Sequence, residues 1–272
     1  MSSALAVFNH SIGRKLVMGL SGLFLVSFLF VHVGGNSLLF LPDDGVTFNK
    51  FVRFMTTNPV IKVLEWVLFA GFLIHFIYAG ILTMQNRQAR PGGYVFKKGE
   101  AVGSTWMSRN MGLTGVIVLL FFAVHVAGFW GRFHFTHGER TTLQTAYLEG
   151  WKVKEVQMVK DDLGRPVIEP GQYLTEDSYY ALKAAGVTEV TGLSMYRMVQ
   201  SAFSNIGVVI FYVIAMILLA LHLSHGFQSA FRTVGLVHSK YTPAIKSLGF
   251  FIAVVIPVVF AAMPLFFFFK SI

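Results

Sequence analysis

Five long apolar stretches divide this chain of 272 residues and leave few folds open to it. They cover about residues 16–41, 60–84, 111–131, 203–227 and 247–269. A helix that crosses a bilayer needs roughly 20 mostly apolar residues, and each stretch reaches that length with few charges. Charged residues make up only 13% of the chain, well below the share in a soluble domain. We therefore predict an all-α integral membrane protein, with residues 1–272 forming one transmembrane domain of five bundled helices.

The first stretch follows two basic residues, as a signal peptide would, but we predict that it is retained. Its apolar run is too long for the apolar part of a signal peptide, and no small-residue cleavage site follows it. With five spans, the N-terminus, residues 85–110 and residues 228–246 share one side of the membrane. That side collects the ten basic residues Arg14, Lys15, Arg87, Arg90, Lys97, Lys98, Arg109, Arg232, Lys240 and Lys246, against Glu100 alone.

This charge distribution predicts the orientation of the chain. Lys and Arg accumulate in cytoplasmic loops, and the segments on the other side sum to zero charge. We therefore expect a cytoplasmic N-terminus, an outer C-terminus and a multi-pass location in the inner (cytoplasmic) membrane. The net charge of +9 is then explained without a nucleic-acid partner. The absence of Cys excludes thiolate metal sites, iron–sulfur ligation and covalently attached haem in this chain.

Four histidines lie in four different apolar stretches, and they match in depth by twos. At about 1.5 Å per helical residue, His32 and His125 lie roughly 25 Å from the basic ends of their helices. His75 and His222 lie roughly 15–18 Å from that same face. One membrane histidine is most often a structural residue, but two pairs at two depths indicate two haems, each held by two imidazoles. His225, three residues after His222, is the alternative ligand on that helix.

The connecting segments differ in character. Residues 42–47 read as a turn, and apolar side chains at Phe48, Phe51, Val52 and Met55 predict a short amphipathic helix on the outer membrane face. Residues 133–200 form a polar outer segment with a helix over about 179–185 and a possible strand over 152–159. Pro257 and Pro264 are expected to kink the last helix.

These residues resemble the five-helix, di-haem cytochrome b membrane anchor of succinate dehydrogenase and fumarate reductase (complex II), of the menaquinone-linked type. The resemblance covers most of residues 10–132 and 203–268 but not residues 133–200. The matching elements are Gly22-Leu23-Phe24 before His32 and Asn36, Phe48-Asn49-x3-Arg53-Phe54-Met55, His75-x4-Gly80, Gly115 before His125, and His222-x3-Gly226-x2-Ser229-x5-Gly235. The last spacing also favours His222 over His225 as the ligand.

The resemblance implies a membrane-anchor subunit that carries electrons and does not itself oxidise succinate. A flavoprotein (FAD) subunit and an iron–sulfur subunit of the complex, which serves the tricarboxylic acid cycle, would dock on the cytoplasmic face. His75 and His222 would bind the proximal haem b, and His32 and His125 the distal haem b. Electrons would pass through both haems to menaquinone in the lipid phase.

Further residues are candidates for contacts with the haem propionates or the quinone. The cytoplasmic candidates are Ser11, Arg14, Lys15, Arg87 and Arg109, although the basic ones among them are also explained as positive-inside anchors. Glu65, the only carboxylate within a span, could relay protons to a quinone, or instead pair with Lys62 or reach the interface. Some family members carry a carboxylate where this chain has Ala220, so a proton path through that position is absent.

Two other functions fit parts of the pattern. The cytochrome b subunit of another quinone-linked dehydrogenase would also bind haem, but such subunits commonly place two histidines on one helix. A transporter with a histidine relay would carry no haem, and it should show inverted repeats or broken helices, neither of which is clear in the sequence. The colour of the purified protein distinguishes the two hypotheses, since a haem protein is coloured and a transporter without haem is colourless.

Overall fold

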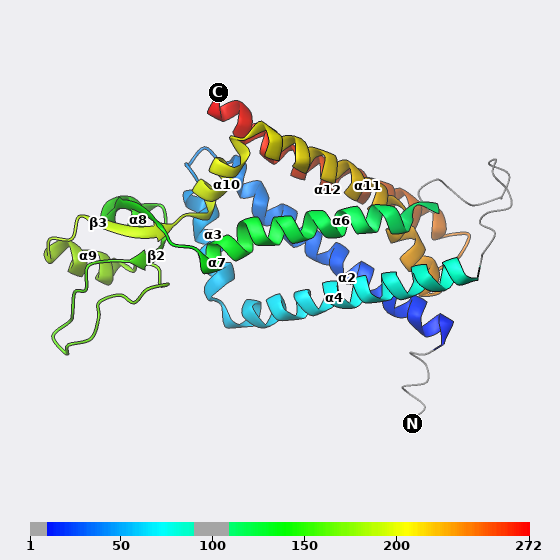
Figure 1. Cartoon of the computed structure of the whole chain (residues 1–272), viewed down its shortest axis with the longest axis horizontal. Coiled ribbons are helices and arrows are strands. Elements are labelled where there is room, and N and C mark those ends of the chain that lie inside the picture. Colours follow the sequence, from blue (N-terminus) through cyan, green and yellow to red (C-terminus); the bar gives the residue numbers. More distant parts are fainter. Residues whose placement is uncertain (1–9, 90–108) are drawn as a thin grey trace. The chain divides into compact units, whose positions relative to one another are not determined.

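The computed structural model describes residues 10–89 and 109–272, and 74% of the chain is helical. Within these residues, five helices are long and apolar enough to cross a membrane, which confirms the predicted fold class (Figure 1). They are α2 (Ser11–Ser37), continued by the 3₁₀ turn η1 (Leu38–Phe40), α4 (Pro59–Gln88), α6 (Met111–His125), α11 (Ile206–Thr233) and α12 (Thr242–Ser271). Of the predicted cytoplasmic charges, Arg90, Lys97, Lys98 and Glu100 lie outside the described residues.

The helices extend beyond the apolar stretches that predicted them. α2 begins at Ser11 and α12 at Thr242, both several residues before the apolar run. An apolar run measures the hydrocarbon thickness, whereas backbone hydrogen bonding continues through the polar interface. At the start of α4, the side-chain oxygen of Asn58 accepts hydrogen bonds from the backbone N–H groups of Val60 and Ile61. α12 continues through Pro257 and Pro264 as one helix.

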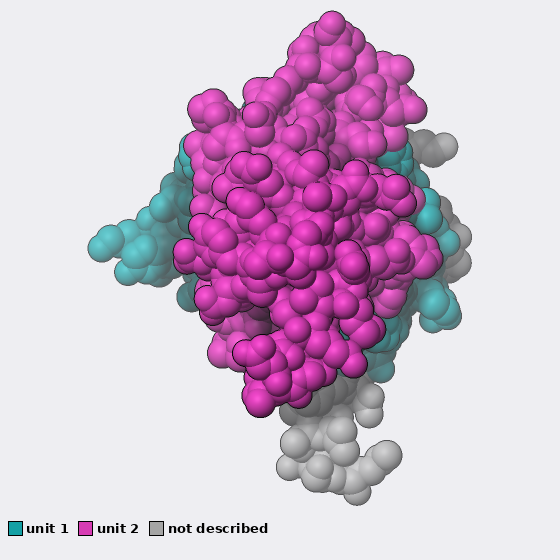
Figure 2. Space-filling view, turned by 90° about the vertical axis from the view of Figure 1, so that its left-hand side faces the viewer, with its two compact units in different colours: residues 1–33, 63–122, 210–262 teal, residues 34–62, 123–209, 263–272 magenta. Residues whose placement is uncertain are grey.

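The chain divides into two compact units, coloured in Figure 2, and each long helix contributes to both. The described part of unit 1 comprises residues 10–33, 63–89, 109–122 and 210–262. Its apolar core joins α2, α11 and α12 through Val26, Leu223, Phe227, Ile252, Ala253 and Ile256. Gly19 of α2 lies against α11, where an added Cβ would be 3.4 Å from Thr233 and 3.5 Å from the backbone of Ala230. Small residues thus let these two helices approach closely.

Unit 2 comprises residues 34–62, 123–209 and 263–272, and it contains the polar segment. Its shorter elements are α3 (Val46–Thr57), α7 (Arg132–Phe135), β1 (Glu139–Thr142), α8 (Leu143–Leu148), β2 (Lys152–Glu155), α9 (Glu176–Ala184), β3 (Glu189–Leu193) and α10 (Met195–Phe203). The strands form an antiparallel sheet in the order β1-β3-β2. The helix expected at 179–185 is largely part of α9, whereas the expected strand covers only 152–155.

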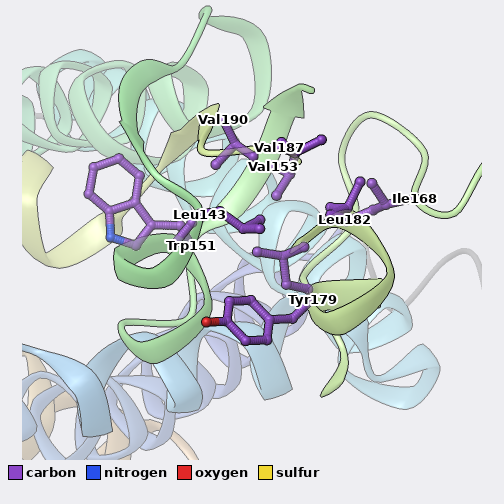
Figure 3. Close-up of a cluster of buried hydrophobic side chains, with 10 residues drawn as sticks. Leu143, Trp151, Val153, Ile168, Tyr179, Leu182, Val187 and Val190 are labelled. Atoms are coloured by element: carbon purple, nitrogen blue, oxygen red, sulfur yellow. The ribbon is translucent and has the colours of Figure 1, made fainter. Parts of the chain in front are cut away.

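The segment between the third and fourth spans has a hydrophobic core of its own. Buried side chains from α8, β2, α9 and β3 meet there, among them Leu143, Trp151, Val153, Leu182 and Val190 (Figure 3). This segment is therefore a small folded α/β structure and not an extended surface loop.

The predicted amphipathic helix exists as α3, and it is tied to the start of α10. The buried Asn49 donates from Nδ2 to Ser194 Oγ at 2.9 Å and accepts from the backbone N–H of Tyr196 at 3.1 Å. Gly45, in the left-handed region with φ of 85°, precedes α3 and lies so close to the Tyr196 ring that a Cβ there would overlap it. These contacts hold α3, β3 and α10 as one assembly within unit 2.

Candidate functional site

Two of the four predicted histidines meet inside unit 1. His75 projects from α4 and His222 from α11, and their ring centres lie 6.4 Å apart with an interplanar angle of 70°. These are the two residues that the depth argument assigned to the inner layer. The structure therefore brings together a pair that is separated by well over a hundred residues of sequence.

Each imidazole of this pair faces a glycine on another helix. A Cβ added to Gly22 of α2 would lie 3.4 Å from Cε1 of His75, and one added to Gly115 of α6 would lie 3.5 Å from Cε1 of His222. Both glycines belong to motifs that carried the family resemblance. Four helices thus contribute to the surroundings of the two rings, two with histidines and two with side-chain-free backbone.

The two imidazoles differ in their polar partners. Nδ1 of His75 lies 3.2 Å from Ser21 Oγ, and Ser21 also donates to the backbone carbonyl of Met18 at 3.1 Å. Nδ1 of His222 is buried and, among the described residues, has no hydrogen-bond partner. Leaving a buried polar atom without a partner costs free energy, so such an atom in a histidine pair points to a function for that ring.

The separation of the two ring centres is compatible with a metal ion bound between the imidazoles. With metal–nitrogen bonds of about 2 Å, two imidazoles on opposite sides of one metal have ring centres roughly 6 Å apart. No group of three or more His, Asp or Glu side chains that could hold a metal is found in residues 10–89 and 109–272. A structural zinc site needs four protein ligands, whereas a haem iron needs only two axial ones, so the pair fits haem better.

The two histidines predicted for the outer layer belong to different units. His32 of α2, in unit 1, stacks on Phe28 with ring centres 5.1 Å apart and lies 5.4 Å from the Phe260 ring. His125, in unit 2, is the last residue of α6 and lies 5.4 Å from Phe129. Their pairing stays a prediction.

The helix that carries His125 changes geometry directly after it. The π-helical segment η2 (Val126–Gly131) follows, and then α7 completes the span. Short π-helical insertions are rare in proteins, and many of those that are known lie at functional sites. Sequence reasoning did not anticipate this insertion, since no residue type announces a π-helical turn.

The remaining candidates lie at helix ends or farther along the helices. Ser11, Arg14 and Lys15 lie in the first turns of α2, Arg87 lies in the last turn of α4, and Arg109 precedes α6. Glu65 lies on α4, roughly 15 Å along the helix axis from His75. His225 is half-buried on α11, and it is His222 that contacts the His75 ring. The roles of these residues in binding propionates or quinone stay predictions.

Ser21 was not singled out in the sequence analysis. A hydroxyl within an apolar span needs a polar partner, and that requirement was the available signal. Ser21 also lines an open, otherwise apolar groove of about 380 Å³ between α2 and α4, beside Phe24 and Gly71.

Comparison with known proteins gives no further guidance, since no protein-family model, curated protein or solved structure matches this chain.

Proposed function

We propose that this chain is the di-haem cytochrome b anchor of a succinate:quinone oxidoreductase, and that it passes electrons to menaquinone. The observation that carries the proposal is the His75–His222 pair, with ring centres 6.4 Å apart inside an apolar helix bundle. Ionisable residues within a membrane are rare and are functional candidates by default, and the ring-centre separation of this pair is compatible with one haem iron held between the two imidazoles. The motif spacing around all four histidines supports the family.

In this proposal the protein holds and separates the two haems. His75 and His222 would hold the proximal haem, and His32 and His125 would hold the distal haem. Neutral imidazoles add no charge to the bilayer interior. Gly22 and Gly115 keep the space beside the proximal ligands free of side chains. Bound haem would supply reversible one-electron transfer, with its potential set by ligands, hydrogen bonds and burial.

The proposed orientation places the proximal pair nearer the cytoplasm. An iron–sulfur subunit and a flavoprotein subunit would then dock at the basic face, where Arg14, Lys15, Arg87 and Arg109 are candidates for propionate contacts. Quinone reduction consumes protons, and Glu65 near the other end of α4 is the candidate relay. With Glu65 as the relay, menaquinone would bind near the outer membrane face. The alternative is a quinone site on the cytoplasmic side, near Ser11 and Arg14.

Haem content tests the proposal directly. Reduced-minus-oxidised spectra and pyridine haemochrome assays should give two b haems per chain in the wild type. Replacing His32, His75, His125 or His222 by Ala should remove one haem each, whereas the matched control His225→Ala should keep both. A colourless wild-type protein would favour the transporter alternative, and full haem retention in the four variants would refute the ligand assignment.

A second experiment distinguishes complex II from other quinone-linked dehydrogenases. The tagged chain is purified from its native membrane, and haem reduction is followed after succinate is added. Reduction by succinate in the co-purified complex supports the proposal. Reduction by a different dehydrogenase substrate, with none by succinate, would assign the cytochrome to another complex.

A further inference from the structure

The Ser21 hydroxyl makes two polar contacts that together define its hydrogen-bonding role. A serine hydroxyl has one proton to donate and two lone pairs to accept with. Ser21 lies 3.1 Å from the backbone carbonyl of Met18, one turn earlier on α2, and a carbonyl can only accept. With its proton directed there, Ser21 Oγ presents a lone pair to His75 Nδ1, which lies 3.2 Å away.

A lone pair facing Nδ1 selects one tautomer of His75. The hydrogen bond forms only when Nδ1 carries the proton, and the neutral ring then has its free lone pair on Nε2. A metal ligand needs that lone pair, and the partner on the other nitrogen fixes the orientation of the ring and raises its basicity. The contact therefore prepares His75 to bind iron through Nε2.

The partner ring lacks an equivalent contact. His222 Nδ1 is buried with no hydrogen-bond partner in the described part of the chain, although the ring faces Gly115 much as His75 faces Gly22. Space beside the two ligands is thus alike, but their hydrogen bonding is not. Two adjacent residues of α2 therefore contact His75 in different ways. Ser21 forms a hydrogen bond with the imidazole, and Gly22 has no side chain that would crowd it.

We propose that Ser21 is a positioning residue that holds His75 in the Nδ1-protonated tautomer and makes it the more basic of the two proximal axial ligands. This inference rests on the proposed function, because it needs haem at the His75–His222 pair. A more basic ligand favours ferric iron. Loss of the hydrogen bond should therefore raise the midpoint potential of the proximal haem and weaken its binding, by roughly 10- to 100-fold as is typical for such outer-shell partners.

Three variants of the full chain test the role of Ser21. Ser21→Ala removes the hydroxyl, whereas Ser21→Thr keeps one that can still bond to the preceding turn. Ser27→Ala is the matched control, because Ser27 also lies on α2 and donates to a carbonyl one turn back, that of Phe24. For each variant, haem per chain, a redox titration and the low-spin ferric haem signals in electron paramagnetic resonance are measured.

We expect Ser21→Ala to change the signal and raise the potential of one haem and to release it faster, with the other haem unchanged. Ser21→Thr and Ser27→Ala should match the wild type. Identical signals and potentials in Ser21→Ala and Ser27→Ala would overturn the proposal. Equal shifts in Ser21→Ala and Ser21→Thr would also overturn it, since they would indicate a packing effect. A wild type without haem would instead refute the proposed function itself.

Discussion

Replacing Asn49 by Ala should loosen the assembly of α3, β3 and α10 without touching the histidines. Asn49 is 2% exposed and Tyr196 is 1% exposed, so water does not replace the amide. The backbone N–H of Tyr196 lies in the first turn of α10 and has no acceptor within the helix. It donates to Asn49 Oδ1 instead. Losing this bond strands a buried donor at a cost of about 1–3 kcal/mol, and the lost bond to Ser194 adds about 1 kcal/mol.

Hydrogen exchange measures this loss locally. A destabilisation of about 2–4 kcal/mol corresponds to roughly 30-fold or more faster exchange of amides that open with this contact. We expect that acceleration in peptides from residues 194–203, measured by mass spectrometry in detergent. The control Asn58→Ala removes a cap at the start of α4 and should leave these peptides unchanged. Unaltered exchange over 194–203 in Asn49→Ala would refute the reasoning.

Three further predictions concern single sites. Gly115→Ala should keep both haems, because the added Cβ would lie at an ordinary contact distance of 3.5 Å from His222. The two further methyl groups of Gly115→Val should crowd His222 and cause loss of one haem. Two haems per chain in the valine variant would contradict this. Burial raises the pKa of Tyr173 against the opposing effects of its hydrogen bond to Thr56 and the charge of Arg53. The folded state therefore favours the neutral phenol, and the stability this contributes is present below the ordinary tyrosine pKa and lost as the pH rises through the raised pKa. Tyr173→Phe should cost about 1 kcal/mol at neutral pH and reduce the alkaline fall in melting temperature, and an unchanged alkaline fall would refute it. Leu182→Ala, at a fully buried position of the small α/β structure, should cost about 2–5 kcal/mol and make residues 139–193 sensitive to protease while haem content stays unchanged; resistance equal to the wild type would argue against this core.

The small α/β structure shows where sequence reasoning stopped. The polarity of residues 133–200 and the helix near Tyr179 were readable, because both depend on neighbouring residues. Of the sheet, only β2 was predicted, and with too long a range. The strands are only four or five residues long, and β3 lies between two strands that precede it in sequence. Its core joins Leu143 to Val190, a pairing that no local pattern records.

The amino-acid sequence alone predicted the five spans and the position of each histidine along its helix. Both follow from local quantities, the length of an apolar run and the rise of a helix per residue. It could not determine which way each ring faces, because the rotation of a helix about its axis depends on packing against distant side chains. Only the tertiary structure brought the rings of His75 and His222 together and set the Ser21 hydroxyl against one of them. The tertiary structure also decided that Asn49 bonds to the first turn of α10, almost 150 residues away, because the buried amide has no water to bond to.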